Sequence, residues 1–189
     1  MKIFTHFSFV SFSNSYLVGP AEGGDAIIID PGIMDVPLLQ LIEKNSYTIR
    51  YILITHNHES HIRGGRTLLK IYPAEVFGGS ANLLDRDSSL LKDGDSIELG
   101  GIKIESLQVF GHSSDSMVYR IGSCFFTGDV LSAGGIGSTP NRYARALLIQ
   151  GIQQKLLSFP KGTVYPGHGP PSTIEAERRF NPFLQKENE

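Results

Sequence analysis

Residues 55–61 read Thr-His-Asn-His-Glu-Ser-His and come directly after the mostly apolar run Arg50–Ile54. A short apolar run before a polar loop is typical of a buried strand. The loop concentrates three of the chain's six histidines. His56 and His58 are two positions apart, so an extended backbone places both rings on one side, and His61 follows across a tight turn. Because imidazole is a common ligand of zinc and iron, this stretch predicts a metal site at the end of a strand.

Three further polar residues stand where a predicted strand runs into a polar or glycine-containing loop: His112, Asp129 and His168. Asp30, directly before Pro31, is most simply a turn-forming aspartate. Taken singly, each has a simpler interpretation. A histidine at a strand end is usually structural or on the surface, and an aspartate beside glycine or proline usually forms a turn. Loops at strand ends are also where side chains converge on a crevice. Beside the histidine cluster, metal binding becomes the favoured interpretation of the group.

Around these residues the sequence predicts alternating strands and helices. Short apolar or alternating runs bounded by glycine, proline or serine predict strands over 2–10, 15–19, 26–30, 50–54, 96–100, 102–110, 116–122, 123–129 and 163–168. Apolar residues at helical spacing predict helices over 36–45, 62–72, 143–157 and 172–180, the last capped by Ser172 or Thr173. A glycine-rich loop is expected over 132–141. Two strand-rich halves, each followed by helices, indicate packed sheets with helices outside, of class α/β or α+β.

Composition limits the other classes of function. The chain has 189 residues, a length that suits one domain, which we expect to span 1–189. A net charge of −2 and a pI of about 6.3 give no support for a nucleic-acid partner. No apolar run approaches the ~18 residues of a membrane span, and the N-terminus lacks the unbroken apolar core of a signal peptide. The single cysteine cannot form an internal disulfide, so we expect a cytoplasmic protein.

The ordered set AIIIDPG (26–32), ITHNHESH (54–61), GHSSDSMVY (111–119), FFTGDVL (125–131) and YPGHGPP (165–171) resembles the metallo-β-lactamase superfamily. Within it, the chain is most similar to the short glyoxalase II-like thioester hydrolases. The resemblance covers nearly the whole chain, in order. It implies a four-layer αββα sandwich with a metal site at one edge, between the two sheets.

The resemblance also implies a ligand set. The first metal would be held by His56, His58 and His112, and Asp129 would bridge to a second metal held by His61 and His168. Asp30 matches the buried aspartate that supports the metal-binding loops in this family.

The chain departs from the family at one ligand. Ser60 stands where the family has an aspartate that binds the second metal. A neutral hydroxyl is a poor ligand, so we expect one firmly bound ion, most simply Zn²⁺, and a weaker second one. Glu59 carries the missing charge one residue earlier, but adjacent side chains usually point in different directions.

The leading hypothesis is a metal-dependent hydrolase of a thioester or related acyl bond, with a metal-bound hydroxide as nucleophile. The substrate would be a small molecule, and the residues assigned to the chemistry are Asp129, Ser60 and Glu59, with Glu59 the candidate to replace the missing carboxylate. Two alternatives stay open. His56, His112 and Asp129 also match the Fe²⁺ triad of the persulfide dioxygenases, relatives in the same superfamily. A non-catalytic metal-binding protein of the same fold is the third interpretation.

Overall fold

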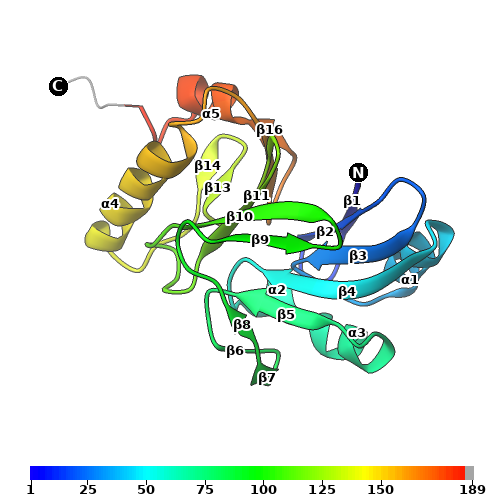
Figure 1. Ribbon diagram of the computed structural model, residues 1–189. Coiled ribbons are helices and arrows are strands. Elements are labelled where there is room, and N and C mark those ends of the chain that lie inside the picture. The colour runs from blue at the N-terminus through cyan, green and yellow to red at the C-terminus, as the bar shows by residue number, and fades with distance from the viewer. Residues whose placement is uncertain (186–189) are drawn as a thin grey trace.

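The structure is a computed structural model that describes residues 1–185. Two six-stranded sheets face each other (Figure 1). The first contains, in spatial order, β1 (Lys2–Phe7), β2 (Asn14–Gly19), β3 (Gly24–Ile29), β4 (Tyr47–Ile54), β5 (Glu75–Gly78) and β8 (Ser89–Leu90). The second contains β16 (Ser172–Thr173), β15 (Thr163–Pro166), β12 (Cys124–Gly128), β11 (Met117–Ile121), β10 (Ile102–Gln108) and β9 (Ser96–Leu99).

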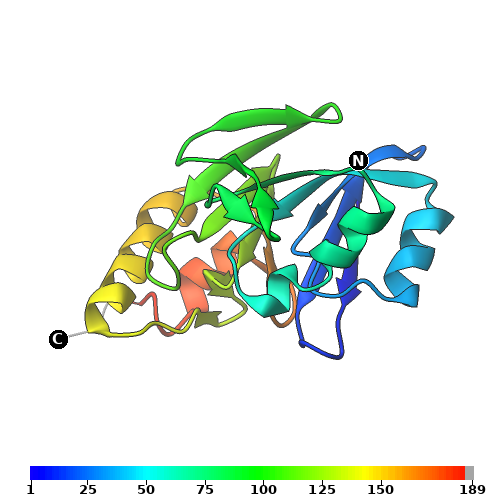
Figure 2. The ribbon, with the colours of Figure 1, turned by 90° about the horizontal axis from the view of Figure 1, so that it is seen from below.

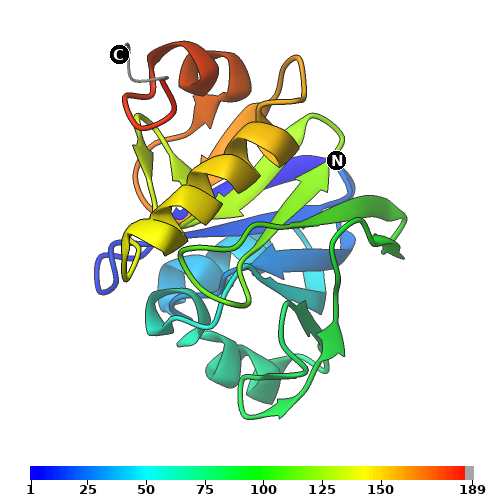
Figure 3. The same ribbon diagram turned by 90° about the vertical axis from the view of Figure 1, so that its left-hand side faces the viewer.

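Helices cover the outer face of each sheet. On the first sheet these are α1 (Val36–Lys44) and α3 (Gly65–Ile71), with the four-residue α2 (Glu59–Ile62) between β4 and α3. On the second they are α4 (Arg142–Gly151), its π-helical continuation η1 (Ile152–Leu156) and α5 (Ile174–Phe180). Seen from below, the two groups of helices lie on opposite sides of the strands (Figure 2), and α4 crosses the face of the second sheet (Figure 3). The protein is therefore the expected four-layer αββα sandwich.

The apolar pattern of the strands explains these layers. Consecutive residues of β3 point to opposite faces of the first sheet: Ile28 packs with Leu38 of α1, whereas Ile27 and Ile29 pack between the sheets with Tyr119 of β11. A strand buried on both faces needs apolar residues at every position, which is why residues 27–29 are three isoleucines. On the outer face of the second sheet, residues of α4 and η1 pack on β11 and β12.

Strand direction brings the loops of the predicted site to one edge. β3 and β4 are parallel, so the loops that follow them leave the first sheet together. In the second sheet β12 and β15 are parallel, and β10 runs the same way because both β10 and β12 are antiparallel to β11. The two edges are joined by hydrogen bonds from Tyr119 Oη to Ile54 O (2.6 Å) and from Met117 N to Thr55 O (2.8 Å).

Several element boundaries differ from the expectation. The first strand ends at Phe7 instead of residue 10, because residues 8–13 turn back on themselves and Phe12 adopts a left-handed φ of 51°. The helix expected over 62–72 begins at Gly65, after the separate α2. The expected loop 132–141 contains part of a hairpin, β13 (Leu131–Ser132) and β14 (Gly135–Ile136).

Other elements were not predicted. The parallel strand β5 and the hairpin β6 (Asn82–Leu83) with β7 (Arg86–Asp87) are too short to show a periodic pattern. Of the two residues expected to cap α5, Ser172 and Thr173, the cap is Thr173, whose hydroxyl accepts from Ala176 N. In residues 1–185, no helix combines the length and apolar composition needed to cross a membrane.

Candidate metal centre

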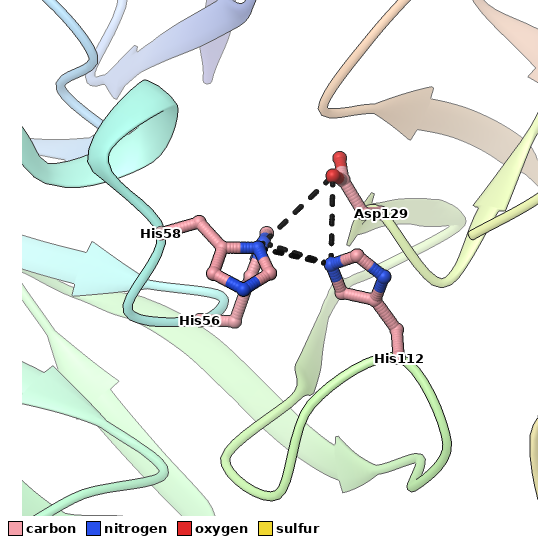
Figure 4. Close-up of side chains that lie close together, drawn as sticks. All are labelled: His56, His58, His112 and Asp129. Atoms are coloured by element: carbon pink, nitrogen blue, oxygen red, sulfur yellow. Dashed lines mark hydrogen bonds and ion pairs between the residues drawn. The ribbon is translucent and has the colours of Figure 1, made fainter. Parts of the chain in front are cut away.

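Six side chains from four segments, those that follow β4, β10, β12 and β15, converge at the edge between the sheets and form two groups that share Asp129. We call His56, His58, His112 and Asp129 the first cluster, and His61, Asp129 and His168 the second cluster. Within each cluster, one potential ligand atom per residue lies within 4.8 Å of all the others. Figure 4 shows the first cluster, with His56 and His58 entering from one loop and His112 and Asp129 from two others.

In the first cluster, ring nitrogens face one another around a common centre. His56 Nε2 is 2.9 Å from His58 Nδ1 and 3.2 Å from His112 Nε2, and His58 Nδ1 is 3.1 Å from His112 Nε2. Asp129 Oδ2 closes the group, 3.8 Å from His56 Nε2 and 3.6 Å from His112 Nε2. Three nitrogens and a carboxylate oxygen are a ligand set that zinc and iron both accept.

The second cluster uses the other oxygen of the same carboxylate. Asp129 Oδ1 lies 3.2 Å from His61 Nε2 and 3.6 Å from His168 Nε2. Both His61 Nε2 and Asp129 Oδ1 are buried, and apart from this contact with each other neither has a hydrogen-bond partner among the described residues. Buried polar atoms normally have partners. Two such atoms aimed at each other therefore fit a bound cation, and Asp129 is placed to bridge two ions.

Outward contacts fix which ring nitrogen faces a cluster in three of the five histidines, namely His61, His112 and His168. His112 Nδ1 donates to Ser138 O (2.8 Å) and His168 Nδ1 donates to Phe12 O (2.7 Å), since a carbonyl can only accept. His61 Nδ1 donates to Asp30 Oδ2 (2.8 Å). In each case Nδ1 carries a proton, so Nε2 is the nitrogen that faces the cluster, the usual arrangement of metal-binding histidines.

Asp30 supports both His61 and the loop that precedes it. Besides His61, its carboxylate accepts from Thr55 N (2.7 Å) and Thr55 Oγ1 (2.6 Å). It is 2% exposed and has a left-handed φ of 50°, a conformation that aspartate tolerates better than most residues. The turn-forming interpretation and the supporting position implied by the resemblance therefore both describe this residue.

The two clusters differ in protonation. Burial, reinforced by the nearby charge of His61, lowers the pKa of His56 to about 3, and burial likewise lowers the pKa of His58. Burial alone would also lower the pKa of His61, but the carboxylates of Asp30 and Asp129 outweigh burial and raise the pKa of His61 to about 10. Burial raises the pKa of Asp129, yet His61 and His56 pull it well below its usual range. His56 and His58 in the first cluster are therefore neutral imidazoles, whereas an ion in the second cluster must displace a proton from His61.

The structure places Glu59 and Ser60 outside both clusters. The side chain of Glu59 is 70% exposed, and its Oε1 lies 3.4 Å from Arg66 Nη1. Ser60 is in α2, where its carbonyl accepts from Ser13 Oγ (2.6 Å). Neither residue belongs to the groups that could hold an ion in the described part of the chain.

The sequence did not predict the residues outside the clusters that form hydrogen bonds with the loops of the metal site. Asp115 lies inside a quoted motif, and its Oδ2 accepts from Asn57 N (2.9 Å) between the first two histidines. Phe12, Ser13 and Asn14 contact the loops of the second cluster. Nothing in the sequence alone marks these positions, because their partners are far away along the chain.

Two cavities flank the clusters. One, of about 180 Å³, is lined by Gly128, Asp129, Ser132, Ile136, Gly137 and His168. The other, of about 370 Å³, lies beside His58 and is lined by Asn57, His58, Gly79, Ser80, Ser114 and Asp115. The second cluster therefore borders one cavity through Asp129 and His168, and the first cluster borders the other through His58.

The fold and the site define a metal-site protein of the metallo-β-lactamase type, and comparison with known proteins agrees. Residues 9–168 match the family model of the metallo-beta-lactamase superfamily, and the chain belongs to that superfamily. It is 31% identical to the human persulfide dioxygenase ETHE1, over 93% of this chain and 72% of that protein. It is 33% identical to a hydroxyacylglutathione hydrolase of Hahella chejuensis, over 67% of this chain and 51% of that protein.

Solved structures show the same architecture. ETHE1 from Myxococcus xanthus superposes with a TM-score of 0.86 at 29% identity, covering 96% of this chain and 84% of that one. TTHA1623 in a di-iron-bound form superposes with a TM-score of 0.80 at 28% identity, covering 96% of this chain and all of that one (100%). A chain of comparable extent thus holds two irons in this fold.

Proposed function

We propose that this protein is a metal-dependent hydrolase that cleaves a thioester or a related acyl bond of a small molecule. The observation that carries the proposal is the position of Asp129, which turns one carboxylate oxygen to each cluster and leaves Oδ1 and His61 Nε2 without other partners within residues 1–185. A bridging carboxylate between two clusters of histidines is suited to a two-metal hydrolytic site. Similarity to hydroxyacylglutathione hydrolase supports the choice of bond.

His56, His58, His112 and Asp129 would hold the main ion, and His61, His168 and Asp129 a second, weaker one; we propose Zn²⁺ for both. When bound, such ions act as Lewis acids and lower the pKa of water from 15.7 to about 7. The protein's own contribution is preorganisation. Ser138 O, Phe12 O and Asp30 each hold one histidine in the tautomer that directs Nε2 inward. Asp129 stays ionised because its pKa is lowered.

Thiol release from a panel of acyl thioesters by the zinc-loaded protein tests the proposal. We expect turnover that Asp129→Asn abolishes, since the variant removes the bridging charge while keeping the size of the side chain. Asp87→Asn, an exposed aspartate of β7, is the matched control and should retain wild-type turnover. Turnover that survives Asp129→Asn would argue against the assignment.

A second candidate function rests on a specific observation. His56, His112 and Asp129 form a two-histidine, one-carboxylate group with Asp129 Oδ2 3.8 and 3.6 Å from the two rings, a ligand set used by mononuclear iron oxygenases. The similarity to human persulfide dioxygenase covers more of this chain than the similarity to the hydrolase. Oxygen consumption by the iron-loaded protein with glutathione persulfide separates the two, because hydrolysis consumes no oxygen. A metal-loaded protein inactive in both assays would favour a binding role.

A further inference from the structure

Four residues that lead into β2 or begin it, Phe12, Ser13, Asn14 and Ser15, each contact a segment that supplies or supports a ligand of the second cluster. They follow the turn that ends β1 early, which the hydrogen bond from Ser8 N to Ser13 O (2.9 Å) closes. In Figure 2 this dark blue turn projects beside the orange loop that carries His168. We call residues 12–15 the β2 entry segment.

Phe12 and Asn14 hold the loop of His168. The carbonyl of Phe12 accepts from His168 Nδ1 at 2.7 Å, which directs the other nitrogen toward Asp129. Asn14 is 4% exposed, and its amide donates to Pro166 O (3.0 Å) and Gly169 O (2.8 Å), on either side of His168. Its backbone N–H donates to Gly167 O (2.8 Å). One asparagine thus fixes three backbone carbonyls of the loop.

Ser13 and Ser15 contact the two segments that carry and support His61, the other histidine of the second cluster. Ser13 is fully buried, and its hydroxyl donates to the carbonyl of Ser60, the residue before His61. Gly32 packs against this contact so closely that a Cβ there would lie 2.7 Å from Ser13 Oγ. Ser15 Oγ donates to Asp30 O (2.6 Å), and the carboxylate of that residue binds the His61 ring.

The first cluster is held from elsewhere. The loop between His56 and His58 is tied through Asn57 N to Asp115, and His112 is tied to Ser138 O. Among the hydrogen bonds of the described residues, none joins the β2 entry segment to a histidine of the first cluster. The two clusters share Asp129, and Asp30 contacts both His61 and Thr55, the residue before His56; the other supports described here are separate.

We propose that the β2 entry segment is the positioning element of the second cluster and sets the affinity of the second ion independently of the first. Because position 60 contributes no carboxylate, the ion must depend on how well His61 and His168 are oriented toward Asp129. The inference rests on the metal site proposed above and not on the reaction, so a failure to find thioester hydrolysis does not bear on it.

The test is a titration of the metal-free protein with Zn²⁺ in the presence of a competing chelator. Asn14→Ala should weaken the second ion by about 10- to 100-fold, the usual effect of removing a group that orients metal ligands. Ser13→Ala should produce a smaller loss in the same direction, and decides the matter if Asn14→Ala does not fold. Affinity for the first ion should not change in either variant.

Two further variants separate positioning from general destabilisation. Ser8→Ala is the matched control, because Ser8 is equally buried in the same turn but its hydroxyl contacts Ser11 and no segment of either cluster. It should bind both ions as the wild type does. Asp115→Ala should show the opposite selectivity and weaken the first ion.

Three results would overturn the proposal: equal losses at both sites in Ser13→Ala, a loss in Ser8→Ala as large as in Ser13→Ala, or unchanged second-ion affinity in both Ser13→Ala and Asn14→Ala. A wild-type chain that binds only one ion up to millimolar zinc would overturn it as well. Thermal unfolding of each metal-free variant, measured in parallel, shows whether the selective loss of second-ion affinity occurs in a variant that is as stable as the wild type.

Discussion

Replacing Asp30 by asparagine should reverse the tautomer of His61 and so weaken the second ion. The orientation of the new amide is set by Thr55, whose backbone N–H can only donate and lies 2.7 Å from Oδ1 of Asp30. The amide oxygen must take that position, which leaves the NH₂ group facing His61 Nδ1. His61 then has to accept at Nδ1 and carry its proton on Nε2, the atom that faces Asp129. Asparagine also tolerates the left-handed φ of 50°, so the backbone should not move.

The size of the effect follows from the three hydrogen bonds to the carboxylate. Hydrogen bonds to a charged group contribute about 1.5–3 kcal/mol and those between neutral groups about 0.5–1.5. Three bonds that each lose about 1 kcal/mol should therefore lower the free energy of unfolding by about 3 kcal/mol. With a urea slope of about 2 kcal/mol per molar, the unfolding midpoint falls by about 1.5 M. Second-ion affinity should fall about 10- to 100-fold, as for other groups that orient ligands.

Urea unfolding of the metal-free protein and zinc titration measure the two effects separately. Asp87→Asn, at an exposed aspartate, makes the same chemical change without buried partners and should alter neither. If Asp30→Asn keeps both the wild-type midpoint and the wild-type affinity for the second ion, the tautomer argument is refuted. A fall in first-ion affinity equal to that of the second would also contradict it.

Three further predictions concern the second cluster and its surroundings. Ser60→Asp should raise zinc content per chain and hydrolysis, as measured by elemental mass spectrometry and thiol release; unchanged occupancy would show that Ser60 is not the limiting defect. Glu59→Gln should leave both zinc affinities unchanged, because this exposed side chain lies beside Arg66 and outside the clusters. The second ion should release about one proton on binding at pH 7, because His61 with a pKa near 10 is protonated there and affinity must rise with pH. Calorimetry in buffers of different ionisation enthalpy measures the number of protons released. His56 should release no proton when the first ion binds, because its pKa of about 3 leaves it neutral at pH 7.

Much of the fold could be predicted from the sequence, because the residue patterns that indicate strands and helices are local. The isoleucine run 27–29 and the apolar run before Thr55 marked buried strands, and both are central in the first sheet. The family and the sandwich architecture that it implies are confirmed. The end of the first strand could not be predicted. No periodic pattern shows that a strand of aromatic and hydroxyl residues stops at Phe7, because the turn after it depends on contacts that Phe12 and Ser13 make with distant parts of the chain.

The sequence by itself determined which side chains gather at the edge, because each predicted ligand follows a strand and strands of one direction end together. Only the tertiary structure decided how they are used. It turned Asp129 Oδ2 to one cluster and Oδ1 to the other, and left Glu59 in solvent. It also tied His168 to Phe12, 156 positions away. Such contacts depend on where two sheets meet, and no local pattern of residues encodes the distance between groups that far apart along the chain.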